Sequence, residues 1–434
     1  MDAFTIEGGR RLEGTTRING SKNAALPLMA AALLTPEPVI LRDVPDLADI
    51  TNMKKLLDTL GCEVIESEKN AEPSLTLCAR DQSQSHAHYD IVRTMRAGIC
   101  VLGPMLASRG VARVSLPGGC AIGERPIDLH LRGLAALGAQ ISLDGGDVVA
   151  TVPTQGLRGT TIFLGGPFGS TVLGTANVMS AAALAKGTSI IESAACEPEI
   201  VDLANLLNAM GARITGAGTP RITIEGVKSL HGAIHTVIPD RIEAGTMMCA
   251  AAITNGSLTI TNTPLDAMLA VTDRLVDLGV HIDILDNKDP MRATCRISSE
   301  RILRPIRVTT QPHPGFPTDL QAQVMALLSI AEGNSIVTER IFPERFLHVA
   351  ELGRMGAQLH RQGATVVVTG VRELHGAPVM ASDLRASASL VIAALAARGT
   401  TIINRVYHID RGYERLEHRL ASLGAAITRT EGSA

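Results

Sequence analysis

The residues most suited to chemistry lie in one glycine-rich stretch, 116–130, which reads LPGGCAIGERPIDLH. Three glycines and a proline surround the thiol of Cys120, and Arg125 follows five residues later. Because glycine loses the most chain entropy on ordering, this composition indicates a mobile loop that brings backbone close to a ligand. A nearby cation favours the thiolate over the thiol. The stretch predicts a reactive thiol, although an incidental cysteine on a surface loop would fit these residues equally well.

A second set of candidates stands just before six apolar, Ala-rich segments. These short stretches are 20–23, 92–96, 169–171, 239–243, 316–319 and 382–385. Ser, Asp and Asn at such positions are ordinary helix N-caps. Lys22, Arg96, Arg241 and Arg385 are not caps, and a cation there opposes the helix dipole unless an anion is also present. Helix N-termini with Lys and Arg form anion sites, so we favour ligand binding over structural ion pairing.

A further candidate is the charged stretch 407–415, which contains two of the three tyrosines. Arg411 beside Gly412 could reach a phosphate or carboxylate with two parallel hydrogen bonds. The alternative is a solvated helix start with i,i+4 charge pairs. The sequence has no G-x-x-x-x-G-K-[ST] phosphate loop, no HExxH and no G-x-S-x-G. We therefore expect no metal and no cofactor, with anions bound by Lys, Arg and backbone amides.

Composition excludes several function classes. The 434 residues carry a formal net charge of −3, and only 2% are aromatic, with no Trp. A nucleic-acid-binding surface is therefore not expected. The first residues show no basic segment followed by an apolar run, and no apolar stretch reaches the ~20 residues needed to span a bilayer. The seven cysteines are scattered, with no CxxC pair, which suits a reducing cytoplasm.

Two recurring sequence motifs mark the helices and strands that must position these candidates. The first motif consists of a long apolar residue, Gly, a small residue, any residue and an aliphatic residue. Its six copies are 60–64, 137–141, 210–214, 278–282, 355–359 and 423–427. Glycine after a helical run is a C-cap, and the β-branched residues beyond it predict a strand. The copies lie about seventy residues apart, which exceeds the ~20–50 residues of solenoid repeats.

The second motif alternates with the first and is an Ala/Leu-rich helix that ends at Gly or a turn and enters a β-branched strand. Residues 183–191 give a clear copy, ALAKGTSII. Because these helices are apolar on nearly all sides, they should be buried beneath sheets. The chain is thus predicted to contain six α/β units, arranged as two lobes of three with a break near residues 236–239.

These motifs, taken in order along the chain, resemble the UDP-N-acetylglucosamine 1-carboxyvinyltransferase family. The matching stretches are 21–27, 93–97, 116–130, 197–202, 239–243, 316–323, 345–349, 383–387 and 407–414. The resemblance implies an α/β (α+β) fold, the two-lobed inside-out α/β barrel of six βαβαββ repeats. It further implies that one lobe spans 22–237 and carries the cysteine loop. The second lobe would combine 1–21 with 238–434, and the active site would lie in the cleft between them.

The same resemblance implies transfer of enolpyruvyl from phosphoenolpyruvate to the 3'-hydroxyl of UDP-N-acetylglucosamine, the first committed step of peptidoglycan synthesis. The residues it assigns to phosphoenolpyruvate are Lys22, Asn23, Arg125 and Arg411. Those it assigns to the sugar nucleotide are Arg96, Arg125, Pro126, Ile127, Asp128, Leu129, Asp319 and Ile341. Cys120 matches the loop cysteine that fosfomycin alkylates in the family.

The chemistry suggests roles for three of these residues. Asp319 is the best candidate for the base, because a carboxylate within hydrogen-bond reach of the attacking hydroxyl suffices. Lys22, with the arginines, would offset the charges of phosphate and carboxylate. Cys120 would either donate a proton or assist product release. Closure of its loop would exclude water. The oligomeric state is not predicted.

One segment departs from the family's pattern. Some relatives carry a Lys before the third buried helix that contacts the nucleotide, whereas the stretch from Gly165 to Gly174 has none. Backbone amides of this glycine-rich turn could replace the cation. An enolpyruvyl transferase for another nucleotide is therefore one alternative, and the shikimate-pathway enzyme of the same fold is another. A non-catalytic sugar-nucleotide sensor is disfavoured, because Lys22, Cys120, Asp319 and Arg411 are all present.

Overall fold

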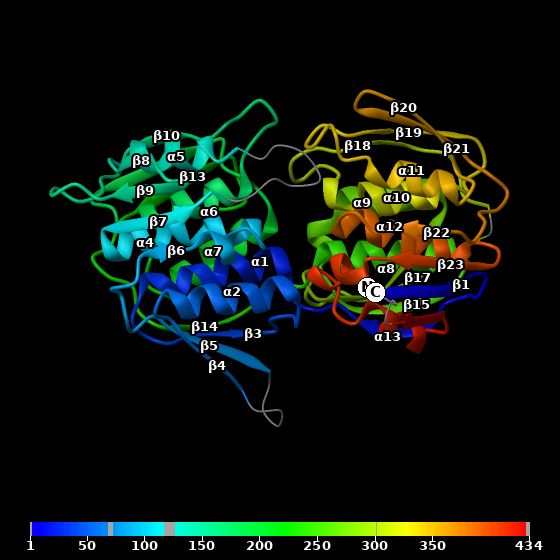
Figure 1. Ribbon diagram of the computed structural model, residues 1–434, viewed down its shortest axis with the longest axis horizontal. Coiled ribbons are helices and arrows are strands. Elements are labelled where there is room, and N and C mark those ends of the chain that lie inside the picture. The colour runs from blue at the N-terminus through cyan, green and yellow to red at the C-terminus, as the bar shows by residue number, and fades with distance from the viewer. Residues whose placement is uncertain (1, 68–72, 117–125, 301, 431–434) are drawn as a thin grey trace. The chain divides into compact units, whose positions relative to one another are not determined.

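The computed structural model describes residues 2–67, 73–116, 126–300 and 302–430, which form two compact units (Figure 1). The N-terminal unit contains the described residues of 20–119 and 124–238, and the C-terminal unit contains those of 2–19 and 239–430. The chain thus passes from one unit to the other after Asn19 and again after Ile238. Each unit has a hydrophobic core of its own. Cys120 and Arg125 lie outside the described residues.

Six four-stranded sheets are built on one plan, which confirms the predicted sixfold α/β repeat. The first two strands of each sheet's order are parallel, and the remaining strands are antiparallel neighbours. The N-terminal unit holds the sheets β14(Ala233–Thr236)-β3(Val39–Arg42)-β5(Ser74–Cys78)-β4(Glu63–Glu66), β6(His86–Ala87)-β7(Val111–Ser115)-β9(Asp147–Thr151)-β8(Gln140–Asp144) and β10(Thr161–Phe163)-β11(Thr188–Glu192)-β13(Arg221–Glu225)-β12(Arg213–Thr215). The C-terminal unit holds the sheets β2(Glu13–Arg17)-β15(Ser257–Thr263)-β17(Ala293–Ser299)-β16(Val280–Asp286), β18(Arg307–Thr309)-β19(Asn334–Thr338)-β21(Thr365–Thr369)-β20(Gln358–Gln362) and β22(Pro378–Met380)-β23(Thr400–Asn404)-β1(Ala3–Glu7)-β24(Ala426–Thr430).

Three sheets are completed by strands distant in sequence. Strand β1 lies between β23 and β24 and is antiparallel to both. Strand β2 pairs in parallel with β15, and β14 pairs in parallel with β3. Strands β1 and β2 therefore belong to the C-terminal unit. Because they pair with later strands of that unit, the chain must leave it after Asn19 and return to it after Ile238.

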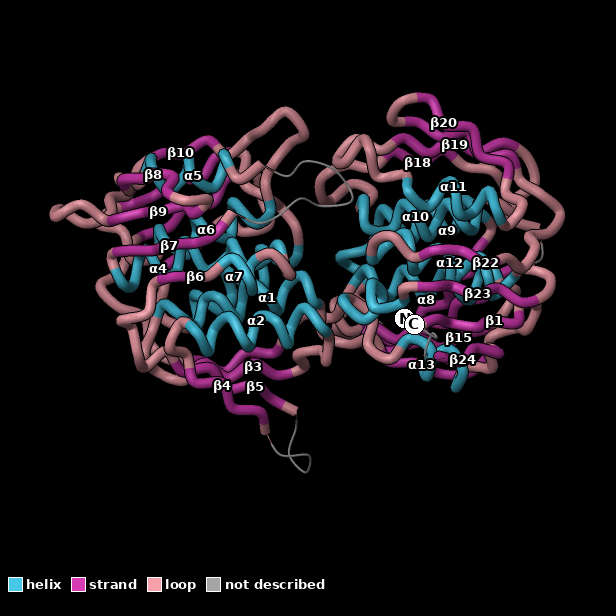
Figure 2. Tube along the Cα trace, in the orientation of Figure 1, coloured by secondary structure: helices cyan, strands magenta, loops and turns pink. Residues whose placement is uncertain are grey.

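The Ala-rich segments form the inner helices, and they are buried as predicted. The inner helices are α1(Lys22–Ala31), α4(Leu102–Arg109), α6(Val172–Ala182), α8(Arg241–Ile253), α10(Gln321–Leu328) and α12(Leu384–Ala396). Helices α4, α6, α10 and α12 each connect the two parallel strands of one sheet, whereas α1 leads from β2 to β3 and α8 from β14 to β15, which are strands of different sheets. Every residue from Ile242 to Ile253 of α8 is buried, and so is every residue from Arg385 to Leu395 of α12. Small side chains allow this, because helices can approach closely from several sides. Figure 2 shows these helices within each unit, with strands along its outside.

The second helix of each repeat is amphipathic and buries one face. These outer helices are α2(Ala48–Thr59), α5(Asp128–Ala136), α7(Pro198–Ala209), α9(Leu269–Leu278), α11(Leu347–Arg354) and α13(Leu416–Ser422). In α9 the buried residues are Val271, Leu275 and Leu278, a spacing that places them on one helical face. The glycine that ends each outer helix has a positive φ, which confirms the predicted C-caps; these are Gly61, Gly138, Gly211, Gly279, Gly356 and Gly424.

Helix α8 ends at a turn in which Asn255, and not the following Gly256, is the left-handed residue. A Cβ on Gly256 would lie 2.3 Å from the main-chain oxygen of Leu12, so the glycine is required by close packing instead. Among the described residues, no helix is long and apolar enough to cross a membrane.

Close helix packing gives a test of the inner layer. A methyl group added at Gly103 of α4 would lie 2.2 Å from the main-chain oxygen of Asn177 on α6. We expect Gly103→Ala to lower the free energy of unfolding by about 1–3 kcal/mol, because the two helices must separate. Gly353, an exposed glycine of α11, has no atom within 4 Å of the added methyl. Gly353→Ala should therefore stabilise by up to about 1 kcal/mol. Urea unfolding measures the free energy of unfolding of both variants. Equal changes for Gly103→Ala and Gly353→Ala would contradict the proposed packing of α4 against α6.

Candidate active site

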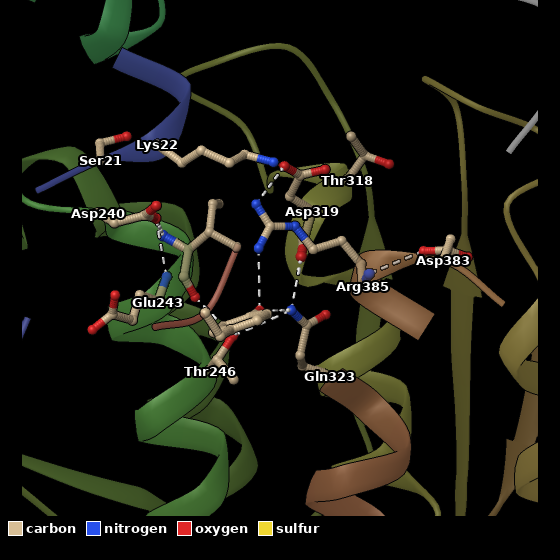
Figure 3. Close-up of polar contacts among 12 residues, drawn as sticks. Ser21, Lys22, Asp240, Glu243, Thr246, Thr318, Asp319, Gln323, Asp383 and Arg385 are labelled. Atoms are coloured by element: carbon tan, nitrogen blue, oxygen red, sulfur yellow. Dashed lines mark hydrogen bonds and ion pairs between the residues drawn. The ribbon is translucent and has the colours of Figure 1, made fainter. Parts of the chain in front are cut away.

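The N-termini of four inner helices are capped by side chains, as the sequence predicted. Ser21 accepts from the main-chain N–H of Ala24, and Thr171 from that of Gly174. Asp240 accepts from the N–H groups of Ile242 and Glu243, while Asp383 caps α12 in the same way (Figure 3). These hydroxyl and carboxylate groups satisfy helix N–H groups that lack partners within the helix.

Asp319 differs from the other acidic residues before inner helices, because its carboxylate does not cap. It lies in the 3-10 turn Thr318–Leu320 before α10, whose N-cap residue makes no side-chain cap bond. Its Oδ1 accepts from Arg345 Nη1 at 2.7 Å, and its Oδ2 from Arg385 Nη2 at 3.1 Å. Both arginines are buried, whereas the Asp319 side chain keeps 23% exposure. Both oxygens of the Asp319 carboxylate are thus bound by guanidinium groups.

A buried glutamate connects Asp319 with Ile341. The Oε1 atom of Glu339 accepts from the main-chain N–H groups of Ile341 and Phe342, at 2.8 and 2.9 Å. Its Oε2 atom accepts from the Thr318 hydroxyl at 2.9 Å. Arg345 Nη1 donates to that same hydroxyl at 3.0 Å. The structure therefore brings these two predicted site residues into one network, which sequence spacing alone did not indicate.

Arg411 ends the 3-10 helix Val406–Arg411, beside His408. The pKa of His408 is lowered, first by burial and then by the charges of Arg405 and Arg411, while Asp383 opposes the shift. Burial has the largest single effect on the pKa of Arg385 and lowers it, but Asp319, Tyr413 and Asp240 together outweigh burial, so the net pKa is raised. Arg385 was predicted to bind a ligand anion, and in the structure it forms an internal ion pair, the alternative considered for this set.

Lys22 opens α1 in the N-terminal unit. Its Nζ donates to Asp49 Oδ2 at 3.2 Å, and both side chains are buried. Asp49 lies in the first turn of α2. Asn23, the next residue, is half-buried. The carboxylate of Asp49 lies within hydrogen-bond distance of the predicted phosphate-binding cation, so it helps fix the position of the Lys22 ammonium.

Arg96 begins the 3-10 helix Arg96–Val101 that leads into α4. Its charge acts on His130, whose pKa is lowered to about 4, mainly by burial and secondly by Arg96. The Asn177 amide donates from Nδ2 to Ile99 O and contacts His130 Nδ1, both at 2.9 Å. Its Oδ1 accepts from Gly103 N–H at 2.7 Å. Because Nδ2 is a donor, His130 Nδ1 must accept, which leaves the ring proton on Nε2.

The predicted nucleotide-binding segment leads into α5. Pro126 and Asp128 are exposed, Ile127 is buried and Leu129 is half-buried. Leu129 packs against the segment from Gly165 to Gly174, which differs from the family's pattern. A Cβ on Gly166 would lie 3.1 Å from Leu129 Cδ1.

The segment from Gly165 to Gly174 contains a tight turn. The N–H of Gly166 donates to the C=O of Gly169 at 2.8 Å, and the N–H of Gly169 donates to the C=O of Gly166 at 3.1 Å. Replacement of the missing cation by backbone amides of this segment stays a prediction. A cation does reach the segment from α5: Arg132 Nη2 donates to Gly165 O at 2.9 Å, and its guanidinium stacks on Phe163.

Sequence reasoning missed four residues of these networks. They are Asp49, Asn177, Glu339 and Arg345. Arg345 belongs to a stretch quoted for the family resemblance, so it could have been found there. Asp49 and Asn177 are buried polar residues whose partners are distant in sequence, and Glu339 joins nearby main-chain N–H groups to the more distant Thr318. A single sequence gives no sign of such distant pairings.

Comparison with known proteins agrees with the fold. The chain matches a solved structure of the enolpyruvyl transferase NikO from Streptomyces tendae with a TM-score of 0.88 and 27% identity, over 100% of this chain and 99% of that one. It also matches EPSP synthase from Acinetobacter baumannii with a TM-score of 0.76 and 17% identity, over 99% and 100% of the chains. Six βαβαββ repeats in two units are thus the architecture of the enolpyruvyl transferases, which confirms the predicted fold class.

Sequence comparison defines the family more closely. The model of the family described as EPSP synthase (3-phosphoshikimate 1-carboxyvinyltransferase) matches residues 6–420. A UDP-N-acetylglucosamine 1-carboxyvinyltransferase from Methylacidiphilum infernorum is 52% identical over 99% of both chains, and one from Akkermansia muciniphila is 50% identical over the same shares. The chain therefore belongs to the EPSP synthase family and, within it, to the UDP-N-acetylglucosamine 1-carboxyvinyltransferases.

The lowered pKa of His130 predicts acid sensitivity. Its pKa is about 4 in the folded protein against an ordinary value of 6.5. Between these values the unfolded chain binds a proton that the folded chain does not, so stability falls as pH falls. From pH 7 to 5 we expect the wild type to lose about 1–2 kcal/mol more than His130→Gln. Urea unfolding at both pH values measures the difference. His231→Gln, at an exposed position, should follow the wild type; parallel curves for all three proteins would contradict the prediction.

Proposed function

We propose that the protein transfers enolpyruvyl from phosphoenolpyruvate to the 3'-hydroxyl of UDP-N-acetylglucosamine and releases phosphate. The observation that carries this proposal is Asp319, an acidic residue spared from capping and held by two buried arginines. Relatives of about 50% identity over nearly the whole chain carry the name of this activity. The reaction is the first committed step of peptidoglycan synthesis.

The proposed chemistry is addition followed by elimination. The 3'-oxygen attacks the central carbon of phosphoenolpyruvate while Asp319 takes the hydroxyl proton and the methylene carbon gains a proton. The resulting tetrahedral ketal then loses a methyl proton and the phosphate, which restores the carbon–carbon double bond and gives the enolpyruvyl ether of the sugar nucleotide. A positioned carboxylate contributes typically 10²–10⁴-fold to such a proton transfer. Cys120 serves either as the proton donor to the methylene carbon or in product release.

We assign the anionic groups of the substrates chiefly to Lys and Arg side chains. Lys22, Asn23, Arg125 and Arg411 bind phosphoenolpyruvate. The residues proposed for the sugar nucleotide are Arg96, Arg125, Pro126, Ile127, Asp128, Leu129, Asp319 and Ile341. The buried Lys22–Asp49 pair supports this assignment, because an ammonium group held in place needs no reorganisation when the charge of the transition state develops.

We further propose that the enzyme works in the cytoplasm, without a metal, a cofactor or a nucleic-acid partner. All six described cysteines are free, in keeping with a reducing compartment. These are Cys62, Cys78, Cys100, Cys196, Cys249 and Cys295.

Phosphate release tests the function directly. We expect release from phosphoenolpyruvate only when UDP-N-acetylglucosamine is added, and loss of that release after incubation with fosfomycin. Cys120→Ser should form no fosfomycin adduct by mass spectrometry, whereas Cys196→Ser should react like the wild type. No release with UDP-N-acetylglucosamine would reject the acceptor, and release with shikimate 3-phosphate would favour the alternative enzyme.

The proposed base gives a sharper prediction. Asp319→Asn keeps the shape of the side chain and removes its basicity, so kcat should fall by about 10²–10⁴. The exposed Asp283 on β16 provides the control, and Asp283→Asn should keep the wild-type rate. Steady-state phosphate release measures both, with the Tm of each variant recorded. A fall of less than about threefold for Asp319→Asn would exclude Asp319 as the base.

A further inference from the structure

A buried tyrosine joins the three inner helices of the C-terminal unit. The Tyr413 side chain is 1% exposed, and its hydroxyl contacts one residue of each inner helix. The partners are Thr246 Oγ1 of α8 at 2.8 Å, Gln323 Nε2 of α10 at 3.1 Å and Arg385 Nη1 of α12 at 3.2 Å. Figure 3 shows Thr246, Gln323 and Arg385 directed toward one another near Asp319.

The direction of each hydrogen bond follows from the groups involved. Arg385 and the Gln323 amide nitrogen can only donate, so they occupy both lone pairs of the tyrosine oxygen. The phenolic proton must then go to Thr246, whose own proton goes to Ile242 O at 2.8 Å. Burial raises the pKa of Tyr413, although Arg385 opposes the shift, so the hydroxyl keeps its proton. Gln323 Nε2 also donates to Thr246 Oγ1 at 3.2 Å, so the amide links both hydroxyl groups of the network.

Both ends of this network lead to Asp319. Gln323 Nε2 also donates to the main-chain oxygen of Asp319 at 2.9 Å. Arg385 contacts Tyr413 through Nη1 and the Asp319 carboxylate through Nη2, and its Cζ lies 5.5 Å from the centroid of the Tyr413 ring. These two hydrogen bonds restrict rotation of the guanidinium. They thereby fix the direction from which Arg385 donates to Asp319 Oδ2.

We propose that Tyr413 is a positioning residue for the reaction, which orients Asp319 toward the substrate hydroxyl through Arg385 and Gln323. The inference rests on the proposed function. Tyr413 itself acts through these two residues and takes no part in bond making. Its hydroxyl should matter for the chemical step and much less for substrate affinity.

Tyr413→Phe removes only the hydroxyl. We expect kcat to fall about tenfold, because a buried hydrogen bond to a charged group is lost, while the KM values change less than about threefold. Thr246→Val removes the acceptor of the phenolic proton and should lower kcat in the same direction. Tyr89→Phe loses the same atom from an exposed ring and should leave kcat unchanged. Equal kcat for Tyr413→Phe and Tyr89→Phe would overturn the proposal.

A double-mutant cycle separates positioning from general packing. If Tyr413 acts through Arg385, adding Tyr413→Phe to Arg385→Lys should lower kcat less than about twofold further. A full tenfold further loss would show an independent, structural role and overturn the proposal.

A readout without turnover keeps this test distinct from that of the proposed function. Nitrogen NMR of ¹⁵N-arginine-labelled protein should show slow rotation of the Arg385 guanidinium in the wild type and in Tyr89→Phe. Faster rotation in Tyr413→Phe is expected even if UDP-N-acetylglucosamine proves to be the wrong acceptor. Unchanged rotation would overturn the positioning role.

Discussion

The constraint on which the structure depends is the burial of the inner helices on all sides. A helix without an exposed face must be built mainly from Ala, Ser and other small or apolar residues, and any polar side chain it carries must find a partner inside the protein, as Asn177 does in α6. In α12, Arg385 is the second residue, and every residue after it to Leu395 is buried. Charges near such helix ends cannot be left without partners, because an unpaired buried charge is very costly. The pairs Lys22–Asp49 and Arg385–Asp319 follow from this constraint.

This constraint also separates two uses of similar residues. Asp240 and Asp383 precede inner helices and are committed to main-chain N–H groups. Asp319 precedes one too, but the turn Thr318–Leu320 intervenes, and its carboxylate is bound by side chains instead. The side chains that bind Asp319 can be oriented by their own neighbours, whereas the main-chain N–H groups that bind Asp240 and Asp383 are fixed by the helix. The residue that differs from its counterparts in the repeat is therefore the one suited to a task other than stability.

Much of the fold could be predicted from the sequence because the same pair of motifs recurs in six units. The repeated glycine after each outer helix and the Ala-rich composition of each inner helix are local signals, and both are confirmed. The insertion of β1 between β23 and β24 is not local, since its pairing residues lie at opposite ends of the chain. The candidate site was predictable as a set of residues but not as a network. Asp319 lies 26 positions from Arg345 and 66 from Arg385, and no spacing rule connects them. Cys120 and Arg125 stay predictions, as they lie outside the described residues.

The position of β1 has a consequence for the order in which the protein is made. All segments of the N-terminal unit lie between residues 20 and 238, so this unit can fold as soon as those residues have left the ribosome. Strand β1 is synthesised before every other described strand, yet its neighbours β23 and β24 follow only at Thr400–Asn404 and Ala426–Thr430. Strand β2 can pair once β15 has been made, at Ser257–Thr263. Because domains generally fold as units during synthesis, β1 stays unpaired until β23 and β24 have been synthesised.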